Sequence, residues 1–406
     1  VFPYRIYSKG SFIPSFKYNI KGHKINDKLQ YLKVFPTYFT KDHYNYYKSI
    51  VGDSESIDNV INNNEKGTDE RDVKKNIVMT LQQISNIIYP VKNKNKFTHG
   101  SKGFQVHNNG NGAFYNTRAK IGKKTIKYFK YQDHVIYDKD TPNEKPFLDI
   151  SILKIVSPKI SSVINQIINS KGISYVYSEY VDGGAMPVAL ALEQAGYERI
   201  TLHNETQLLD YSKNKNGGGG KSQPRCYLCG KNIKDHAHSP NNKSGHRFKV
   251  GKYVIIAGSL MDNKNIVQEY INVLNSPDNI DGGLIKVIIG TRVTGEGVDM
   301  TGIRQIHILE PWWNLSRLEQ IIGRGIRYKS HMHLDEKNRN VELFQYVVLP
   351  PTTSSQKEKD TETIDVYTYK KAEIKDIHIK EVEYLIKQMA IDCNFFKKNN
   401  ERIKNK

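Results

Sequence analysis

An alternation of short apolar runs with helical segments, beginning near Ile160, is the feature that most restricts how this chain folds. The apolar runs have the length of buried strands, and helix-like segments separate several of them. The strand candidates are ISYVYS (173–178), RITLH (199–203), KYVIIAG (252–258), IKVIIG (285–290), RQIHIL (304–309) and VELFQYVVL (341–349). The helix candidates are PVALALEQAG (187–196), residues 265–274 and a segment that starts at Arg317. Strands that alternate with helices predict an α/β fold, with a parallel sheet covered on both faces.

The same pattern divides the chain into three regions. Residues 1–150 are polar and rich in Tyr, Lys and Asn, and we expect them to be mostly helical and irregular, with one amphipathic helix over 73–88. Residues 151–350 form the α/β lobe, whose strand pattern stops between 204 and 251 and therefore predicts an insertion there. Residues 351–406 are predicted to form one amphipathic helix and a basic tail.

The chain carries a formal net charge of +19 over 406 residues. Such a surplus favours a polyanionic partner, DNA or RNA first, although a solvated lysine-rich surface explains it equally well. Three cysteines give no disulfide framework, which indicates a reducing, intracellular compartment. We expect no membrane partner, because the sequence contains no apolar run of about 18 residues.

The stretch NGGGGKSQPRCYLCG (216–230) invites comparison with a phosphate-binding loop. The pattern G-x-x-x-x-G-K-[ST] requires a glycine five residues before the glycine of the G-K-S triplet, and position 215 is Lys. The loop also has to leave a strand and open a helix, whereas Pro224 lies where that helix would run. The four glycines are better explained as a flexible linker.

A C-x-x-C pair follows the glycines and is accompanied by three histidines. Zinc prefers tetrahedral sites made of thiolate and imidazole groups, and C-x-x-C places two thiolates on one turn. Cys226, Cys229 and His246 are the firmer ligands, and either His236 or His238 completes the set. The surrounding segment is loop-like and poor in apolar residues, so we expect the zinc to be structural.

A helix with a basic edge is predicted near the end of the lobe. Ser316 and Glu319 form S-x-x-E, the pattern of a capping box, which predicts a helix that starts at Arg317. Gln320, Arg324 and Arg327 are spaced four and three apart, so they share one face of that helix. Two arginines on one edge suit an anionic ligand such as phosphate, although a solvated polar face is the alternative.

The loop before that helix, residues 291–299, leaves a predicted buried strand at Gly290. Gly295 and Gly297 permit close approach of the backbone to a ligand. The carboxyl ends of parallel strands are where open α/β sheets bind ligands, so this loop is a second site candidate. An ordinary strand connection is the alternative.

These stretches resemble the motifs of superfamily 2 helicases and translocases. Q-x-x-G-R-x-x-R is similar to motif VI, TRVTGEGVD (291–299) to motif V, and GISYVYS (172–178) to the motif IV strand of the second RecA-like lobe. The resemblance is to helicases of nucleocytoplasmic large DNA viruses, of the poxvirus nucleoside triphosphatase I and early transcription factor small subunit type. It extends with gaps from about Phe2 to Cys393, and it is weakest in the N-terminal region.

The resemblance implies a role for each matching residue. Arg324 and Arg327 would reach the γ-phosphate of an ATP held between two lobes, and Gln320 would orient that edge. Asp299 would contact the ribose, while Gly297 and Gly323 belong to the same ATP-binding set. Thr291 and Ser178 would contact the nucleic-acid backbone, which gives grip without sequence recognition.

The sequence departs from the family pattern in one respect, because it contains neither G-x-x-x-x-G-K-[ST] nor an apolar run ending in Asp-Glu. We therefore expect the chain to be the C-terminal half of a helicase, sharing ATP and Mg with a first RecA-like lobe upstream, and to hydrolyse no ATP alone. Transcription machinery is a further expected partner, in a virion or the host cytoplasm. The alternatives are a non-catalytic nucleic-acid-binding transcription-factor module on the same scaffold, or a zinc-centred protein-interaction module.

Overall fold

The structure is a computed structural model of the 406-residue chain. It describes residues 5–11, 29, 32–51, 68–91, 96–104, 112–121, 124–132, 145–200, 202, 207–210, 223–237, 246–257, 264–295 and 298–389. The predicted linker glycines (217–220), Lys221, Ser222, His238, Gly297 and the basic tail lie outside these residues.

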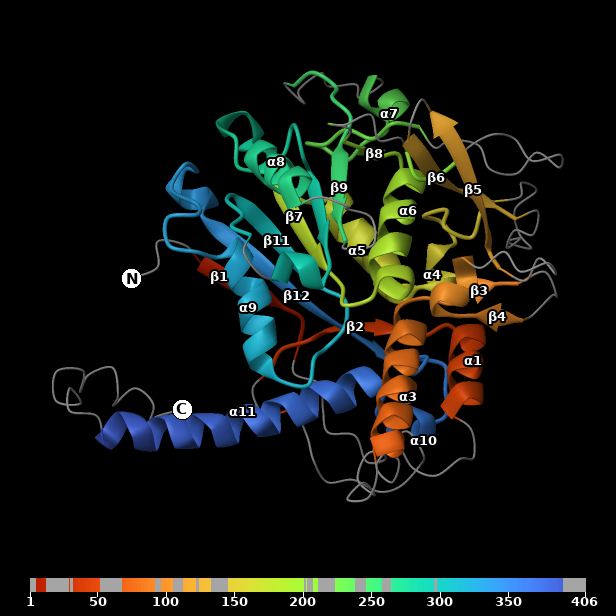
Figure 1. Ribbon diagram of the computed structural model, residues 1–406, viewed down its shortest axis with the longest axis vertical. Helices are drawn as coiled ribbons and strands as arrows, with labels where there is room; N and C mark the ends of the chain where they lie inside the picture. The colour runs from red at the N-terminus through yellow and green to blue at the C-terminus, as the bar shows by residue number, and fades with distance from the viewer. Residues whose placement is uncertain are drawn as a thin grey trace.

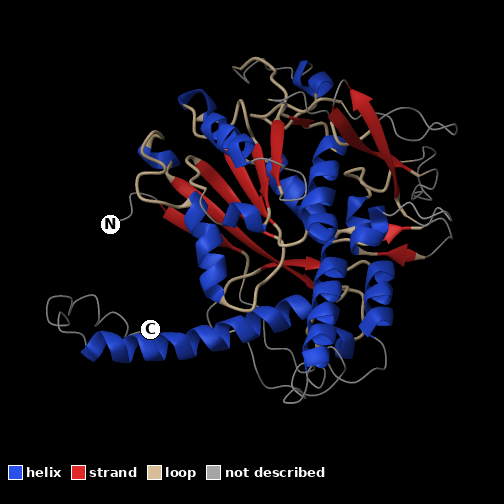
Figure 2. Ribbon diagram, viewed as in Figure 1, coloured by secondary structure: helices blue, strands red, loops and turns tan. Residues whose placement is uncertain are grey.

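An eight-stranded sheet forms the centre of the molecule (Figures 1 and 2). Its main path runs β1-β12-β11-β7-β10-β9-β8, β2 also pairs with β12, and every pairing is parallel. The strands are β1 (Arg5–Lys9), β2 (Phe35–Tyr38), β7 (Ile173–Tyr177), β8 (Glu198–Arg199), β9 (Lys252–Ile256), β10 (Val287–Gly290), β11 (Ile303–Ile308) and β12 (Asn340–Leu349).

Helices cover both faces of this sheet. Successive strand residues point to opposite sides, and both sets are apolar here, so both faces have to be buried. In β9, Tyr253 and Ile255 belong to one apolar cluster, whereas Val254 and Ile256 belong to the other. The first cluster is closed by α1 (Lys41–Val51), α3 (Thr68–Asn86), α4 (Leu153–Val156), α5 (Pro158–Ile168) and α6 (Met186–Gln194). The second is closed by α8 (Lys264–Leu274), α9 (Leu315–Gly325) and the first turns of α11 (Ile364–Met389).

The predicted α/β lobe is confirmed. The strands expected near residues 173, 252, 285, 304 and 341 are present, and so are the helices over 187–196 and 265–274 and the amphipathic helix over 73–88. The strand expected at 199–203 is shorter and starts earlier, because β8 pairs only Glu198 and Arg199 with β9. Gly196 ends α6 with a φ of 97°, a conformation that favours glycine.

The first 150 residues contain strands that the sequence analysis did not anticipate. Besides β1 and β2, they form the short pair β3 (Tyr89–Pro90) and β4 (Phe97–Thr98) and the hairpin β5 (Phe114–Ile121) and β6 (Lys124–Tyr131). Tyr47, Leu81 and Phe114 from this region lie in the same apolar cluster as α5 and α6. A division of the chain at residue 150 remains a prediction, but the core continues across that position.

The long helix α11 leaves the body of the molecule after its first half (Figure 1). Tyr369 and Ala372 are fully buried, whereas Val382 and Leu385 are exposed. The remaining short helices are α7 (Ile233–Ala237) and α10 (Gln356–Lys359). Within the described residues, no helix has both the length and the apolar character needed to cross a bilayer.

Candidate functional site

The loops that follow β7, β10 and β11 meet at the carboxyl edge of the sheet, because neighbouring parallel strands end on the same side. This edge is where open α/β sheets bind ligands. Most of the predicted site residues lie on these loops or on α9, which follows β11. The predicted metal ligands lie elsewhere.

The start of α9 differs from the prediction. Its N-cap is Asn314, whose side-chain oxygen accepts the backbone N–H of Arg317 at 3.1 Å, and the helix begins at Leu315. The predicted capping box of Ser316 and Glu319 is therefore wrong. Asn is as good an N-cap as Ser, and Asn314 already has the extended backbone that a cap requires.

Gln320 and Arg324 lie on α9, with Gln320 exposed and Arg324 half-buried. Leu318 and Ile321 face the sheet and are buried. A Cβ atom added at Gly323 would meet no atom within 4 Å, so this side of the helix is open.

Arg327 does not share the helical face with them, because α9 ends at Gly325. That part of the prediction is wrong, and Arg327 lies on the following turn, beside the residues that precede β11, where the Arg324 carbonyl accepts the N–H of Met300 at 3.2 Å. Its guanidinium donates to Asp299 Oδ1 at 2.5 Å and to the carbonyl of Gly323 at 3.3 Å. Arg327 and Asp299 are 43% and 63% exposed, and an exposed ion pair contributes only about 0–1 kcal/mol. A phosphate group can therefore compete with Asp299 for Arg327.

Thr291 follows β10 and is buried. Its N–H donates to the carbonyl of Ile256 at 3.2 Å, and its own carbonyl accepts the hydroxyl of Thr294 at 2.7 Å. The next residue, Arg292, is exposed at the same edge and was not identified as a site residue from the sequence. It lies five residues before Gly297 in the loop that carries the motif V resemblance.

Ser178, at the end of β7, is fully buried. Its hydroxyl donates to Glu310 Oε1 at 2.6 Å, and the same oxygen accepts the N–H groups of Glu179 and Tyr180 at 3.0 and 3.4 Å. Burial raises the pKa of Glu310 to about 7. In this arrangement Ser178 shapes the loop from within, and a phosphate contact requires its hydroxyl to become uncovered.

Arg317 joins α9 to the loop after β7, a role that the sequence analysis missed. Its guanidinium donates to Glu179 Oε2 at 2.7 Å and to the Tyr177 hydroxyl at 3.1 Å, and it lies 4.6 Å from the ring centre of Trp312. No local signal reveals this contact, because the partners follow different strands. The contact fixes the helix that carries Gln320 and Arg324 relative to the sheet.

Helix α3 supports the same loops from the N-terminal region. The Gln82 side chain donates to the carbonyl of Pro311 at 3.1 Å and accepts the Tyr180 hydroxyl at 2.6 Å. The Asn86 side chain donates to the carbonyl of Gly183 at 3.0 Å. The carboxyl edge is therefore built partly by residues far outside the motif region.

The candidate metal centre consists of Cys226, Cys229, His236 and His246, whose ligand atoms all lie within 4.8 Å of one another. Cys226 pairs with Val250 in an antiparallel bridge. The Gly230 N–H donates to the Cys226 carbonyl at 3.0 Å and closes the C-x-x-C turn. Helix α7 carries His236, and His246 precedes β9.

The geometry of these four groups fits a tetrahedral zinc ion. Zn–N bonds of about 2.05 Å and Zn–S bonds of about 2.3 Å place two ligand nitrogens about 3.3 Å apart, and a nitrogen and a sulfur about 3.5 Å apart. The Nε2 atoms of His236 and His246 are 3.3 Å apart, and Cys226 Sγ lies 3.3 Å from His246 Nε2. Of the two candidates for the fourth ligand, the structure brings His236 to the group, whereas His238 lies outside the described residues.

Burial alone would raise the pKa of the Cys226 thiol, but backbone N–H groups of Cys229 and Leu228 and the His246 ring outweigh it and lower the pKa to about 7. The module sits on the amino edge of the sheet. The Arg225 N–H donates to the Gly196 carbonyl at 2.9 Å, and the Tyr227 hydroxyl donates to Asp281 at 2.6 Å, just before β8 and β10 respectively. The cluster therefore lies beside β8 and β9, away from the loops that follow β7, β10 and β11.

Residues 252–329 match the helicase conserved C-terminal domain family. The matched segment runs from the first residue of β9 to just beyond Arg327, so it includes the whole predicted motif VI. This match assigns the segment 252–329 to that domain family, and the sheet around it has the parallel α/β architecture of a RecA-like lobe.

The individual proteins that the chain resembles come from large DNA viruses, which confirms the predicted resemblance. The chain is 32% identical over 248 residues to an ATP-dependent RNA helicase of Acanthamoeba polyphaga mimivirus, covering 58% of this chain and 20% of the relative. It is 28% identical over 254 residues to a termination factor NPH-I homolog of African swine fever virus, covering 59% of this chain and 33% of the relative. A helicase of Invertebrate iridescent virus 3 is 36% identical over 135 residues, which cover 33% of this chain and 13% of the relative.

The chain thus spans between an eighth and a third of the length of these relatives. Among solved structures, the C-terminal part of the Fun30 ATPase domain aligns with 85% of this chain and 93% of its own, at 9% identity and a TM-score of 0.38. At that distance the alignment adds nothing to the fold described by the sheet.

Proposed function

We propose that this chain is the second RecA-like lobe of an ATP-dependent nucleic-acid helicase or translocase. The observation that carries the proposal is the grouping of Gln320, Arg324 and the Arg327–Asp299 pair on the open side and at the C-terminal end of α9, inside the segment that matches the helicase domain. Charged arginines at such a partly exposed helix end are suited to stabilising phosphate groups.

The nucleotide in this proposal is ATP with Mg, held mainly by a first RecA-like lobe. Arg324 and Arg327 approach its γ-phosphate, where arginines stabilise the charge that develops during phosphoryl transfer. Gln320 orients that edge, and Asp299, released from Arg327, contacts the ribose. Gly297 and Gly323 have no side chain to obstruct the nucleotide.

The nucleic acid contacts the carboxyl edge of the sheet, at the loops after β7 and β10. The exposed Arg292 is a phosphate ligand in these loops, and Thr291 and Ser178 contact the nucleic-acid backbone once their buried side chains are uncovered. DNA and RNA are both candidates. The names of the relatives, RNA helicase and termination factor, favour transcription in a virus, with transcription machinery as a partner in the virion or host cytoplasm.

Zinc is the proposed structural ion of the insertion. Cys226, Cys229, His236 and His246 would hold it at the amino edge, beside β8 and β9. In that position the ion closes a loop segment that has few apolar residues of its own, and it takes no part in phosphate chemistry.

The test is steady-state ATP hydrolysis by a protein that contains both this chain and a first lobe. Arg324→Ala should lower kcat by about a thousandfold or more with a small change in KM, since the arginine acts chiefly on the transition state. Arg324→Lys keeps the positive charge but loses the forked geometry of the guanidinium, so its kcat should lie between those of the wild type and Arg324→Ala. Lys387→Ala, on the exposed part of α11, is the control and should leave hydrolysis unchanged.

Hydrolysis that stays within twofold after Arg324→Ala would refute the catalytic role. If nucleic-acid binding persisted in that case, the chain would be a non-catalytic binding module on a helicase scaffold. The 406-residue chain by itself should hydrolyse no ATP.

A further inference from the structure

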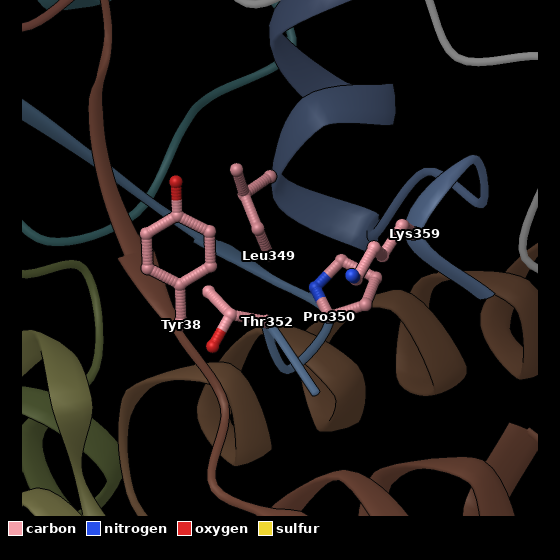
Figure 3. A pocket seen from close by; sticks show the side chains of 5 residues that line it. All are labelled: Tyr38, Leu349, Pro350, Thr352 and Lys359. Carbon is pink, nitrogen blue, oxygen red and sulfur yellow. The ribbon is translucent and has the colours of Figure 1, made fainter. Parts of the chain in front are cut away.

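A pocket of about 280 Å³ lies at the carboxyl ends of β2 and β12, away from the loops discussed above. It is lined by Tyr38, Leu349, Pro350, Thr352 and Lys359 (Figure 3). The ring of Tyr38 and the ring of Pro350 lie on either side of it, with Leu349 between them and the Lys359 ammonium beside Pro350. The pocket is therefore a mainly apolar slot with one cation at its rim.

The walls of this pocket are fixed by the sheet. Residues Phe35–Tyr38 pair in register with Tyr346–Leu349, and the N–H of Phe39 donates to the Leu349 carbonyl at 2.9 Å. Tyr38 is nevertheless 42% exposed, so its ring face is held in place without being covered. An exposed aromatic ring on a rigid strand is a platform on which a flat ligand can stack.

The cation at the rim is also held in place. Lys359 belongs to α10, which begins with a full capping box of Ser355 and Glu358. The Glu358 carboxylate is occupied by Lys48 at 2.6 Å, and no ion pair of Lys359 is found among the described residues. Among the described residues, Lys359 is the only charged one that lines the pocket, so the slot favours a ligand that combines a flat apolar ring with negative charge.

We propose that this pocket receives an unstacked base of single-stranded nucleic acid, with Lys359 on the adjacent phosphate. This inference rests on the proposed function for the presence of nucleic acid at this edge of the sheet. β2 is separated from β10 by four strand spacings, about 19 Å across the sheet, and Tyr38 pairs with Leu349, four positions beyond the Gln345 that is level with Gly290. Tyr38 therefore lies roughly 20 Å or more from Thr291 on the same carboxyl edge. A strand bound to the loops after β7 and β10 can therefore continue to this pocket.

Two features favour a nucleic-acid strand over other flat ligands. The chain carries a net charge of +19, which attracts a polyanion far more strongly than a neutral aromatic side chain. Bases of any sequence stack on aromatic rings, so the pocket would add affinity without sequence preference. The contacts to the nucleic-acid phosphates and the contact to a base would then come from different β-strands of the same sheet.

Binding of fluorescently labelled oligothymidylate and oligouridylate to the 406-residue chain, measured by anisotropy, tests the inference. Tyr38→Ala should weaken binding about tenfold, within the range for loss of one base stack, whereas Tyr38→Phe should bind like the wild type. Lys359→Gln should reduce the slope of log K against log salt by about 0.7, the value for one phosphate contact on a single strand. Thermal unfolding of each variant confirms that it is folded.

An oligonucleotide with abasic sites provides the matched control, because it keeps the phosphates and lacks the bases. Its affinity should be the same for wild type and Tyr38→Ala. Equal affinities of Tyr38→Ala and wild type for the intact strand would overturn the inference while leaving the proposed function standing. A loss of affinity that is equal for intact and abasic strands would overturn it as well, because the effect would not then depend on a base.

Two further outcomes separate the sources of failure. No binding of either strand by the wild-type chain would refute the nucleic-acid part of the proposed function, and the inference with it. Tyr38-dependent binding of uridine monophosphate, without any Tyr38 effect on the strands, would show a free-nucleotide site and overturn the proposal. Photo-crosslinking of a 4-thiouridine strand to the peptide that contains Tyr38 would support it, even if Tyr38→Ala failed to fold.

Discussion

Glu310 is a fully buried carboxyl group whose two oxygens have different surroundings. Oε1 accepts three hydrogen bonds, from the Ser178 hydroxyl and from two backbone N–H groups. Oε2 has no partner among the described residues. A proton on Oε2 would neutralise the group without disturbing Oε1, which is consistent with the raised pKa of about 7.

The pH dependence of stability should reveal this proton. The pKa of Glu310 is about 7 in the folded chain and near 4.5 in the unfolded chain, so the folded state binds the proton more tightly. As the pH rises from about 4.5 to about 7, the free energy of unfolding of the wild type should fall relative to Glu310→Gln, by at most about 1.4 kcal/mol per pH unit. Urea unfolding of both proteins over this pH range measures the difference.

The glutamine variant is a close match, because its carbonyl can replace Oε1 and its amide group can take the place of Oε2. Burial lowers the pKa values of His43 and His307 to about 3, and these groups change stability in the opposite direction. Their contributions are the same in both proteins and cancel. A difference in stability that does not depend on pH would rule out the raised pKa.

For single residues, the sequence predicted which side chains belong to the candidate site better than it predicted how they are placed. The spacing of Gln320 and Arg324 identifies one edge of a helix, and the structure places both residues there. The spacing did not reveal that the helix ends at Gly325, because Ile326 and Arg327 continue the same pattern. Glu310 and Arg317 were missed since each acts on a loop that follows another strand, which a linear motif does not record.

The metal module is held together largely by backbone hydrogen bonds. Its C-x-x-C turn, α7 and the strand-like bridge to Val250 are joined mainly by backbone hydrogen bonds. A bound ion would therefore supply much of the energy that orders it. The sequence predicted the Cys and His residues from their chemistry, but the choice of the fourth ligand required the turn that brings His236 next to His246.

Zinc analysis of single variants should show which histidine is a ligand. We expect one zinc ion per wild-type chain, loss of that zinc in Cys229→Ser and His236→Ala, and retention in His238→Ala, measured by plasma mass spectrometry on the purified proteins. Hydrogen exchange should rise over 223–237 and 246–251 in the zinc-free variants and stay unchanged in β7 and β10. Zinc retained in His236→Ala but lost in His238→Ala would reverse the assignment.

The strands of the lobe could be predicted because each is an apolar run of its own. β1 and β2 gave no such signal, since they are short, consecutive residues Ile6, Tyr7 and Ser8 of β1 are all exposed, and only Thr37 of β2 is buried. They are strands only because β12 is long enough to pair with both. Their partners lie more than 300 positions away in the sequence. For example, the Gln345 side chain donates a hydrogen bond to the carbonyl of Lys33, 312 positions away.

Across the whole molecule, one buried ion pair connects the early, middle and late parts of the chain. The Lys159 ammonium on α5 lies 2.7 Å from Asp365 at the start of α11, and both side chains are fully buried. It also donates to the Asn86 side chain on α3 at 3.1 Å and to the Leu309 carbonyl after β11 at 3.0 Å. Removing one partner would leave an uncompensated charge in the core.

Lys159→Met should therefore lower the free energy of unfolding by about 3–5 kcal/mol, the usual loss when one member of a buried pair is removed. The double variant Lys159→Met with Asp365→Leu should recover most of that loss, because no charge is then left unpaired. Lys387→Met, which breaks an exposed pair with Glu383, is the control and should cost less than about 1 kcal/mol. Urea unfolding measures all three, and a double variant no more stable than Lys159→Met would contradict the explanation.

The pairing of β12 with both β1 and β2 has a consequence for synthesis. At about 5–20 residues per second, a ribosome needs roughly 15–60 s to make the 300 or so residues that separate these strands from their partner. During that time the edges of β1 and β2 lack β12 as a partner strand, and unpaired strand edges are prone to aggregation. A nascent chain of this protein thus depends on its last strand to complete its first, and a premature stop before Asn340 would leave both N-terminal strands without a sheet.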